Sequence, residues 1–523
     1  MIFAVIRTIL FAAIIVIALS IQPLCAEEPA PSGKQPQAPT PKLKITETPL
    51  GIDRRETREW LLVSPDLRHV AYSAEQNDKF VVIVDGVKGK EYERVMPGVP
   101  QVNESGVYQA YAEHGPVFSP DSKHTAYVGK RGGKLVAVVN GTEGKEYDDI
   151  KDCAILFSPD SKRVAYQARR GDKWVVVVDE AEGKEYDEVS ALAFSPNSTR
   201  TAYQARHGNK GVVVVDGIEG KEYDNVSRLA FSPDSKRIAC VALRGERCVV
   251  VVDGNESKEY DDLAEPGVIF SPDSKRFAYA TKIGNKWLAV IDGVEGKEWD
   301  SIGRSGLIFS PDSSRAAYAA RHGDQMRVVI SDTEGKEYDG IGADIRFSPN
   351  SKRVAYEAKH DDKWCVVVDG TEGDEYDGIG EGSLIFSNDS KRLAYVAGHE
   401  EEMFVVVDRV KEKGYDGILE GSLSFSPDST RVAYLAGRGK NMLVVAGGVE
   451  GKEYQDMHHV LFSPDSKHTA SIAYNDGKWL IVVDGVEAME CGWLLSGRNI
   501  IFDSPNKFHV LSPSSLVEIE ITE

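Results

Sequence analysis

The stretch FSPDSKRVAY at residues 157–166 decides the fold. It places a turn after an apolar residue, because Pro159 fixes φ at the second turn position and Asp160 suits the next. The segment WVVVVD at 174–179 is apolar without alternation, which predicts a strand buried on both faces. The charged segment KEYD at 184–187 predicts a strand at a solvent-facing edge.

This unit recurs along the chain at intervals of 37 to 39 residues. Its turn phrase, or a near relative, begins at Phe118, Phe157, Phe194, Phe231, Phe270, Phe309, Phe347, Phe386, Phe425 and Phe462. An earlier copy opens at Val63 and a truncated last copy at Phe502, which makes twelve units. Four short strands in about 40 residues match one propeller blade, so we predict an all-β β-propeller of about twelve four-stranded blades.

The phrase FSPDSKRVAY resembles the WD40-like propeller repeat of the TolB type, whose usual form has Asp-Gly where this chain has Asp-Ser or Asn-Ser. The resemblance covers nearly all of residues 57–511. It implies the propeller fold but not one activity, because propellers host many unrelated functions.

The number of rings depends on how the units are grouped. Propellers typically carry about 4–8 blades, so twelve units favour two six-bladed rings, at residues 43–303 and 304–523. One large ring is the alternative. The last unit has only three strands, ending at 516–522, and the segment Leu43 to Thr48 could supply the fourth and close a ring.

The N-terminus has the pattern of an export signal. Arg7 precedes an apolar run from Thr8 to Ile21, and a small residue, Ala26, ends the segment, which predicts a signal peptide at 1–26. Residues 27–42 are rich in Pro, Gln and Ala and predict a flexible linker. We therefore expect an extracytoplasmic protein, periplasmic or secreted, with no membrane span after signal removal. The alternative is a protein tethered by an uncleaved N-terminal segment.

Charge limits the classes of partner. The chain of 523 residues has 62 Lys and Arg against 82 Asp and Glu, a net charge of −20. Such an acidic chain is not expected to bind nucleic acid or an anionic membrane surface.

Motifs for chemistry are missing from the sequence. It has no G-x-S-x-G elbow, no H-E-x-x-H zinc motif, no calcium loop and no phosphate-binding loop. We expect His458 and His459 to be ordinary solvated polar residues of a loop. We predict no catalytic, metal-binding or cofactor-binding residues and no cofactor. The expected function is a non-enzymatic protein–protein interaction or scaffold module of the cell envelope.

Two alternatives stay open. One is a propeller enzyme, a lyase or hydrolase, and the other is a glycan- or solute-binding propeller, each with its site at the channel mouth. An enzyme would present unmatched carboxylates, His or Arg in one or two blades. The near-uniform repeats favour binding instead.

Two further features repeat with the unit. The turn aspartates, such as Asp121 and Asp160, are expected to accept hydrogen bonds from local backbone N–H groups. Tyrosines such as Tyr166 are followed eight residues later by an aromatic residue such as Trp174. We expect these two side chains to pair across the hairpin and to pack in the core rather than bind carbohydrate.

The hairpin tip four residues after the tyrosine position is often basic. We predict a basic rim that binds a protein or peptide partner, with an acidic segment or an anionic glycan as candidates, or alternatively a soluble turn copied with no partner. The candidate partner-binding residues are Arg131, Arg170, His207, Arg244, His322, His360, His399 and Arg438.

One pair of cysteines occupies the positions of the aromatic pair. Cys240 and Cys248 lie eight residues apart in one blade, so a disulfide across the hairpin is one prediction. Two buried free thiols are the alternative.

Overall fold

The computed structural model describes residues 41–50, 61–96, 115–303, 306–491, 499–512 and 515–522. Throughout these residues every regular element is a β-strand, and they contain no helix with the length and apolar character of a membrane span. The predicted signal peptide at 1–26, and the linker at 27–42 except its last two residues, lie outside the described residues. Residues 41–523 form one compact unit.

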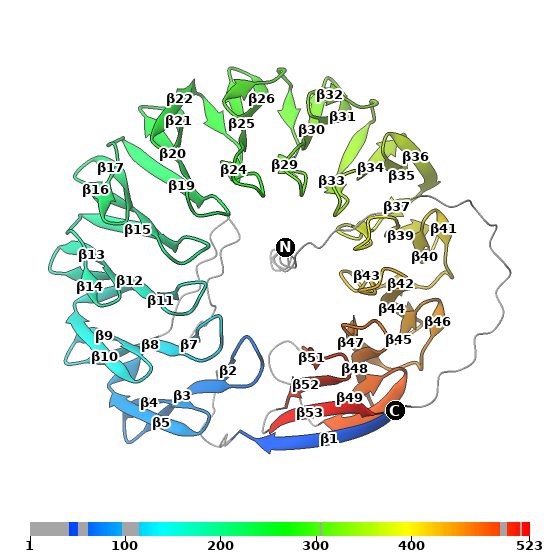
Figure 1. Ribbon diagram of the computed structural model, residues 1–523, viewed down its shortest axis with the longest axis horizontal. Coiled ribbons are helices and arrows are strands. Elements are labelled where there is room, and N and C mark those ends of the chain that lie inside the picture. Colours follow the sequence, from blue (N-terminus) through cyan, green and yellow to red (C-terminus); the bar gives the residue numbers. More distant parts are fainter. Residues whose placement is uncertain are drawn as a thin grey trace. The chain divides into compact units, whose positions relative to one another are not determined.

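Each repeat forms its own antiparallel sheet (Figure 1), and the sheets are numbered in chain order. Sheets 1 to 4 comprise β2 (Leu61–Val63), β3 (Val70–Gln76), β4 (Lys79–Val84) and β5 (Val87–Tyr92); β6 (Arg94–Val95), β7 (Val117–Phe118), β8 (Thr125–Arg131), β9 (Lys134–Val139) and β10 (Thr142–Tyr147); β11 (Asp149–Phe157), β12 (Val164–Arg170), β13 (Lys173–Val178) and β14 (Ala181–Glu182); and β15 (Glu188–Phe194), β16 (Thr201–His207), β17 (Lys210–Val215) and β18 (Ile218–Glu219).

Sheets 5 to 8 comprise β19 (Asn225–Phe231), β20 (Ile238–Arg244), β21 (Arg247–Val252) and β22 (Asn255–Tyr260); β23 (Asp262–Leu263), β24 (Ile269–Phe270), β25 (Phe277–Ile283), β26 (Lys286–Ile291) and β27 (Val294–Glu295); β28 (Ser301–Ile302), β29 (Ile308–Phe309), β30 (Ala316–His322), β31 (Gln325–Ile330) and β32 (Thr333–Glu334); and β33 (Gly340–Phe347), β34 (Val354–His360), β35 (Lys363–Val368) and β36 (Thr371–Tyr376).

Sheets 9 to 12 comprise β37 (Gly378–Ile379), β38 (Ile385–Phe386), β39 (Leu393–His399), β40 (Glu402–Val407) and β41 (Val410–Lys411); β42 (Gly417–Ile418), β43 (Ser424–Phe425), β44 (Val432–Arg438), β45 (Asn441–Ala446) and β46 (Val449–Glu450); β47 (Asp456–Phe462), β48 (Thr469–Asn475), β49 (Lys478–Val483) and β50 (Val486–Cys491); and β51 (Ile501–Ser504), β52 (Lys507–Leu511), β53 (Ser515–Thr522) and β1 (Lys42–Pro49).

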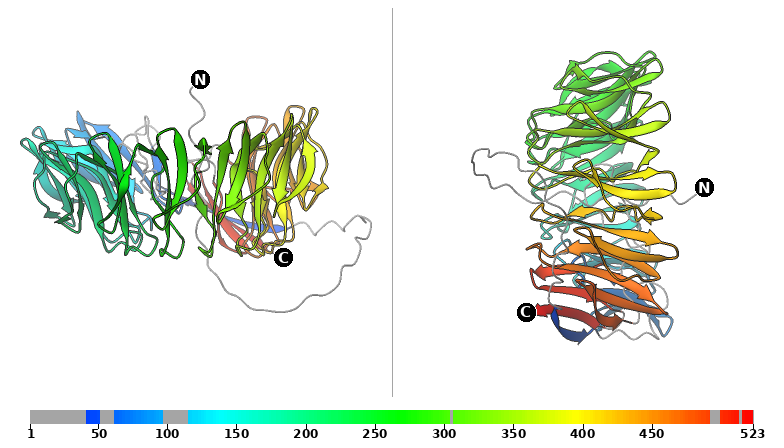
Figure 2. Two further views of the ribbon diagram at one scale, coloured as in Figure 1. Left: turned by 90° about the horizontal axis from the view of Figure 1, so that it is seen from above. Right: turned by 90° about the vertical axis from the view of Figure 1, so that its right-hand side faces the viewer.

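Sheet 12 joins the two ends of the described chain. β1 runs antiparallel to β53 over its whole length, with Leu43 opposite Ile521 and Ile45 opposite Ile519. Figures 1 and 2 show β1 in blue beside the red C-terminal strands. The prediction that the N-terminal segment completes the last, three-stranded unit is therefore confirmed.

The core lies between consecutive sheets. In one cluster, Ala165 and Val176 of sheet 3 pack against Val189, Leu192 and Tyr203 of sheet 4. This arrangement explains why the third strand of each repeat is apolar on both faces, since each face meets a different neighbour. The expectation from residues 174–179 is confirmed, because Val175, Val176 and Val177 are all buried.

The S-P-D-S turn also ties one sheet to the next. The Asp160 carboxylate accepts a hydrogen bond from Lys162 N at 3.2 Å, as expected for a local turn. Asp160 N itself donates to the hydroxyl of Ser198, in the turn of sheet 4, at 2.9 Å. Equivalent bonds of 2.8–3.1 Å join the turns of all consecutive sheets from sheet 1 to sheet 11.

Candidate functional site

The predicted partner-binding residues all lie at hairpin tips, and each has a carboxylate within ion-pair distance. Arg170 meets Glu182 at 2.8 Å, Arg438 meets Glu450 at 2.6 Å and His207 meets Glu219 at 3.2 Å. Arg131 and Arg244 each contact two glutamates. His322, His360 and His399 face Asp300, Asp339 and Asp377 at 3.9, 3.8 and 3.3 Å.

These counter-ions change the electrostatics of the predicted rim. A cation beside a carboxylate presents little net charge beyond the screening distance of about 8–10 Å. The glutamates lie 12 or 15 residues after the tips, and the aspartates lie 21 to 22 residues before them. The sequence of the tips alone therefore does not predict these counter-ions. Binding of a partner by these eight residues stays a prediction.

At five of the tips, the paired glutamate belongs to a network that spans two sheets; these tips are Arg131, Arg170, His207, Arg244 and Arg438. Glu182 of sheet 3 accepts hydrogen bonds from the Tyr147 hydroxyl at 2.8 Å and from Lys145 at 3.2 Å, both in sheet 2. The hydrogen bonds from Tyr147 and Arg170 lower the pKa of Glu182 to about 2. The recurring segment E-G-K-E-Y carries this network, and its periodic glutamate and tyrosine are the sequence signal that could have revealed it.

The aromatic pairs were assigned wrongly. The strand register puts Tyr166 opposite Val177 and Trp174 opposite Arg169, so the two rings are not cross-strand partners. Tyr166 instead meets Tyr147 of the preceding sheet edge-on, with ring centroids 6.1 Å apart. The expectation of core packing is confirmed for Tyr166, which is buried, whereas Trp174 is half-buried at the border of a core cluster.

The structure does not form the predicted disulfide. Cys240 lies opposite Val251 and Cys248 opposite Leu243, and both thiols are free. Cys240 packs toward sheet 4 and Cys248 toward sheet 6, so the side chains leave opposite faces of sheet 5. The alternative of two free thiols fits these positions. A separation of eight residues shifts the pair by three positions from direct register, which explains the error.

One carboxylate breaks the repeat pattern. Glu357, in β34, is 5% exposed, and its Oε1 has no hydrogen-bond partner among the described residues. Burial, and then the charge of Asp344, raise the pKa of Glu357 to about 8. The equivalent residues in sheets 3 and 4 are the neutral Gln167 and Gln204. Sequence reasoning missed this exception by treating the repeats as uniform.

The pair His458-His459 lies in the strand β47 and not in the expected loop. His458 Nε2 is 3.0 Å from the Asp456 carboxylate. Within the described part of the chain, no group of three or more His, Cys, Asp or Glu side chains could hold a metal ion.

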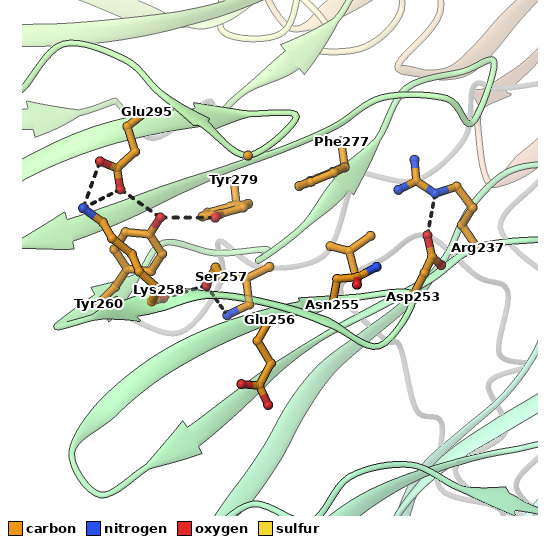
Figure 3. Close-up of a pocket in the computed structure, with 13 residues that line it drawn as sticks. Arg237, Asp253, Asn255, Glu256, Ser257, Lys258, Tyr260, Phe277, Tyr279 and Glu295 are labelled. Carbon is orange, nitrogen blue, oxygen red and sulfur yellow. Dashed lines mark hydrogen bonds and ion pairs between the residues drawn. The ribbon is translucent and has the colours of Figure 1, made fainter.

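The first cavity lies between sheets 5 and 6 and has a volume of about 540 Å³. At one end Glu295 receives hydrogen bonds from Lys258 at 2.9 Å and from the Tyr260 hydroxyl at 3.0 Å (Figure 3). At the other end Arg237 binds Asp253 at 2.8 Å. At each end of the cavity, the polar side chains are thus already paired among themselves.

The second cavity lies on the other side of sheet 5, against sheet 4, and has a volume of about 320 Å³. Its walls are mainly aliphatic, and its lining includes Val213, Val215, Leu229, Ile238 and Val251. Tyr223, Glu219 and Cys240 also border it. Both cavities therefore flank sheet 5.

Comparisons with known proteins add only a general likeness. No protein-family model matches the chain, and no curated protein matches it. Among solved structures, a eukaryotic initiation factor shares 13% identity over 63% of this chain and 94% of its own, with a TM-score of 0.33. TolB from Acinetobacter baumannii shares 17% identity over 42% of this chain and 61% of its own, with a TM-score of 0.23. The Dos1 propeller shares 11% identity over 56% of this chain and 90% of its own, with a TM-score of 0.29.

At these values the neighbours carry no information on function. What the structure itself shows is one antiparallel sheet per repeat, with the S-P-D-S turn or a variant of it before the strand that holds Tyr166 and its equivalents.

Proposed function

We propose that this protein is an exported, non-enzymatic β-propeller that acts as a protein–protein interaction or scaffold module of the cell envelope. One observation carries the proposal: five branched aliphatic side chains are exposed by 63–74% at the same position of their repeats. They open the last strand of sheets 1, 4, 6, 9 and 10 and are Val87, Ile218, Val294, Val410 and Val449.

The position does not require an aliphatic residue. Sheets 2, 7 and 8 have Thr142, Thr333 and Thr371 there. Exposed apolar side chains on a strongly charged surface gain free energy when a partner covers them. We therefore propose these aliphatic residues, rather than the ion-paired tip cations, as the contacts to a protein partner.

A non-enzymatic role is supported by how the repeat uses its charged groups. Turn aspartates bind backbone N–H groups, and the glutamates of E-G-K-E-Y join neighbouring sheets, as in Asp160 and Glu182. Export is supported by the apolar run at residues 8–21 and the small residue that ends the segment.

For the architecture we propose one closed ring, the alternative to two rings of six. Turn hydrogen bonds link sheets 1 to 11 in order, including the bond from Asp273 N of sheet 6 to Ser313 of sheet 7 at 2.9 Å. Sheets 11 and 12 share a hydrophobic cluster. Sheet 12 meets sheet 1 through Arg68 and Asp503 at 2.8 Å. The division at residues 43–303 and 304–523 stays a prediction.

The interaction proposal is tested by capture from envelope extract of the native organism with immobilised residues 27–523. The variant changes Val87, Val294, Val410 and Val449 together to Thr, the residue found at this position in other repeats. Ile218 is kept because it also lines the second cavity. We expect the wild type to capture a specific protein that the variant does not.

A matched control changes Arg131, Arg170, Arg244 and Arg438 together to Ser. If the aliphatic contacts matter, this control retains capture, while equal capture by the wild type and the Thr variant would contradict the proposal. Circular dichroism of each variant verifies the fold.

A further inference from the structure

One aromatic position recurs in almost every repeat. The strand after the S-P-D-S turn or its variant carries a tyrosine in sheets 1 to 4 and 6 to 10, whereas sheet 5 has Cys240 and sheet 11 has Ser471. In seven cases the tyrosine ring meets edge-on the tyrosine that closes the preceding sheet, with centroids 5.9–6.3 Å apart. The tyrosine ring therefore usually fills the space between two consecutive sheets.

At sheet 5 a much smaller side chain stands in place of the tyrosine ring. Tyr223 closes sheet 4 as Tyr186 closes sheet 3, but it faces Cys240 where Tyr186 faces Tyr203. The cavity of about 320 Å³ borders Cys240 and Tyr223. The equivalent cavity between sheets 5 and 6 also exists, at about 540 Å³, although Tyr279 is present there. The volume alone therefore does not mark the missing ring, and the difference at sheet 5 is the small Cys240 side chain in place of a tyrosine.

The surroundings of a recurring glycine also show that the ring is missing at sheet 5. A Cβ built on Gly183 would lie 3.4 Å from the hydroxyl of Tyr203, and one on Gly144 would lie 3.3 Å from that of Tyr166. At the equivalent Gly220, apart from its chain neighbours, the described residues place only the carbonyl oxygen of Val213 within 4 Å of such a Cβ. Gly220 lines the cavity, so the missing group includes the hydroxyl end of the ring.

The chemistry of the cavity suits an aromatic ring with one polar end. Its aliphatic walls match the ring faces, while Cys240 is a neutral wall because burial raises the pKa of its thiol to about 12. At the polar end the Tyr223 hydroxyl donates to Glu256 at 2.7 Å. At the next junction, the counterpart Tyr260 of sheet 5 has its hydroxyl 3.4 Å from that of Tyr279 of sheet 6, so two phenol groups fit side by side at that junction.

We propose that the cavity between sheets 4 and 5 binds a small molecule bearing a single phenol ring, seated where the other sheets place a tyrosine side chain. The volume is ample, since apolar cavities of about 150 Å³ bind benzene. It also falls within the usual range for small-molecule pockets, about 300–1,000 Å³. The inference does not depend on the proposed protein–protein function.

The test uses the exported chain, residues 27–523, and 4-methylphenol, which reproduces the tyrosine side chain, in calorimetry and saturation-transfer NMR. We expect binding with a dissociation constant on the order of 1 mM or tighter for a ligand of this size. Cys240→Tyr supplies the ring from the protein and is expected to lower affinity at least tenfold while raising the melting temperature. Cys240→Leu fills the cavity with less volume and tests the same loss if the tyrosine variant does not fold.

Two controls locate the site and define the ligand class. Tyr203→Cys removes the same ring one sheet earlier and is expected to add a second binding site for 4-methylphenol. Toluene, which lacks the hydroxyl, is expected to bind at least tenfold more weakly. No binding by the wild type, or equal binding by a folded Cys240→Tyr or Cys240→Leu variant, would overturn the proposal. Toluene binding as tight as that of 4-methylphenol would also overturn it as a phenol site.

Discussion

Ser235 shows how a single residue serves two sheets. Its φ of 66° lies in the left-handed region, where a side chain costs about 1 kcal/mol that glycine avoids. Its hydroxyl accepts a hydrogen bond from Asn197 N of the preceding sheet at 2.9 Å. The bond to the neighbouring sheet therefore offsets local strain, which explains how serine replaces the glycine of the usual repeat.

The two roles of Ser235 can be separated by mutation. Ser235→Ala keeps the strain and removes the hydrogen bond to the part-buried N–H group of Asn197, so we expect a loss of about 1 kcal/mol in the free energy of unfolding. Ser235→Gly loses the same bond but relieves the strain, and we expect a smaller loss. Denaturant unfolding of both variants measures the difference. A glycine variant less stable than the alanine variant would contradict this account.

Glu357 makes stability depend on pH in an unusual direction. Its pKa is raised from 4.5 to about 8 in the folded chain. As the pH rises, the Glu357 carboxyl ionises at a lower pH in the unfolded chain than in the folded chain. The stability that goes with the protonated carboxyl is therefore present below pH 4.5 and is lost as the pH rises to about 8.

Glu357→Gln is therefore expected to raise stability at pH 7 by about 1–3 kcal/mol and to remove most of the decline between pH 5 and 8. The matched control is Gln167→Glu, which places a carboxyl at the same position of sheet 3 and is expected to introduce such a decline. Thermal unfolding across this pH range measures both. A wild-type chain whose stability is flat over this range would show that Glu357 is not buried as described.

At the scale of elements, β1 protects an exposed edge. It pairs with β53 over Lys42–Pro49, and Leu43 packs against the cluster shared by sheets 11 and 12. Deleting residues 42–49 should leave the edge of β53 unpaired, which favours association between chains. We expect a lower melting temperature and concentration-dependent oligomers.

A peptide of residues 42–50 added in trans should rebind the vacant edge and restore the melting temperature, whereas a scrambled peptide should not. Calorimetry measures the binding. A truncated chain that stays monomeric and equally stable would contradict the role assigned to β1.

The elements were largely predictable, and the contacts between them were not. The turn chemistry and the uninterrupted apolar strands of the repeat gave the four strands and the role of residues 43–48. Periodicity alone does not set register, so Tyr166 and Cys240 were given the wrong partners. The counter-ion Glu182 depends on how the strands of sheet 3 pair, and the cavity beside Cys240 depends on how sheets 4 and 5 face one another. A linear pattern contains neither kind of information.

At the scale of the whole molecule, hydrogen bonds, ion pairs or hydrophobic contacts join every sheet to the next. The same turn bond occurs at the junction of sheets 6 and 7, where two rings would separate, and β1 joins the last sheet to the start of the chain. A single ring distributes the cores evenly and places every sheet between two neighbours.

Electron microscopy of negatively stained single particles of residues 27–523 tests the central claim most directly. Face views are predicted to show one closed ring of twelve blades around a central opening. Particles with two adjacent smaller discs, each of about six blades, would contradict the single ring and favour the division at residues 43–303 and 304–523.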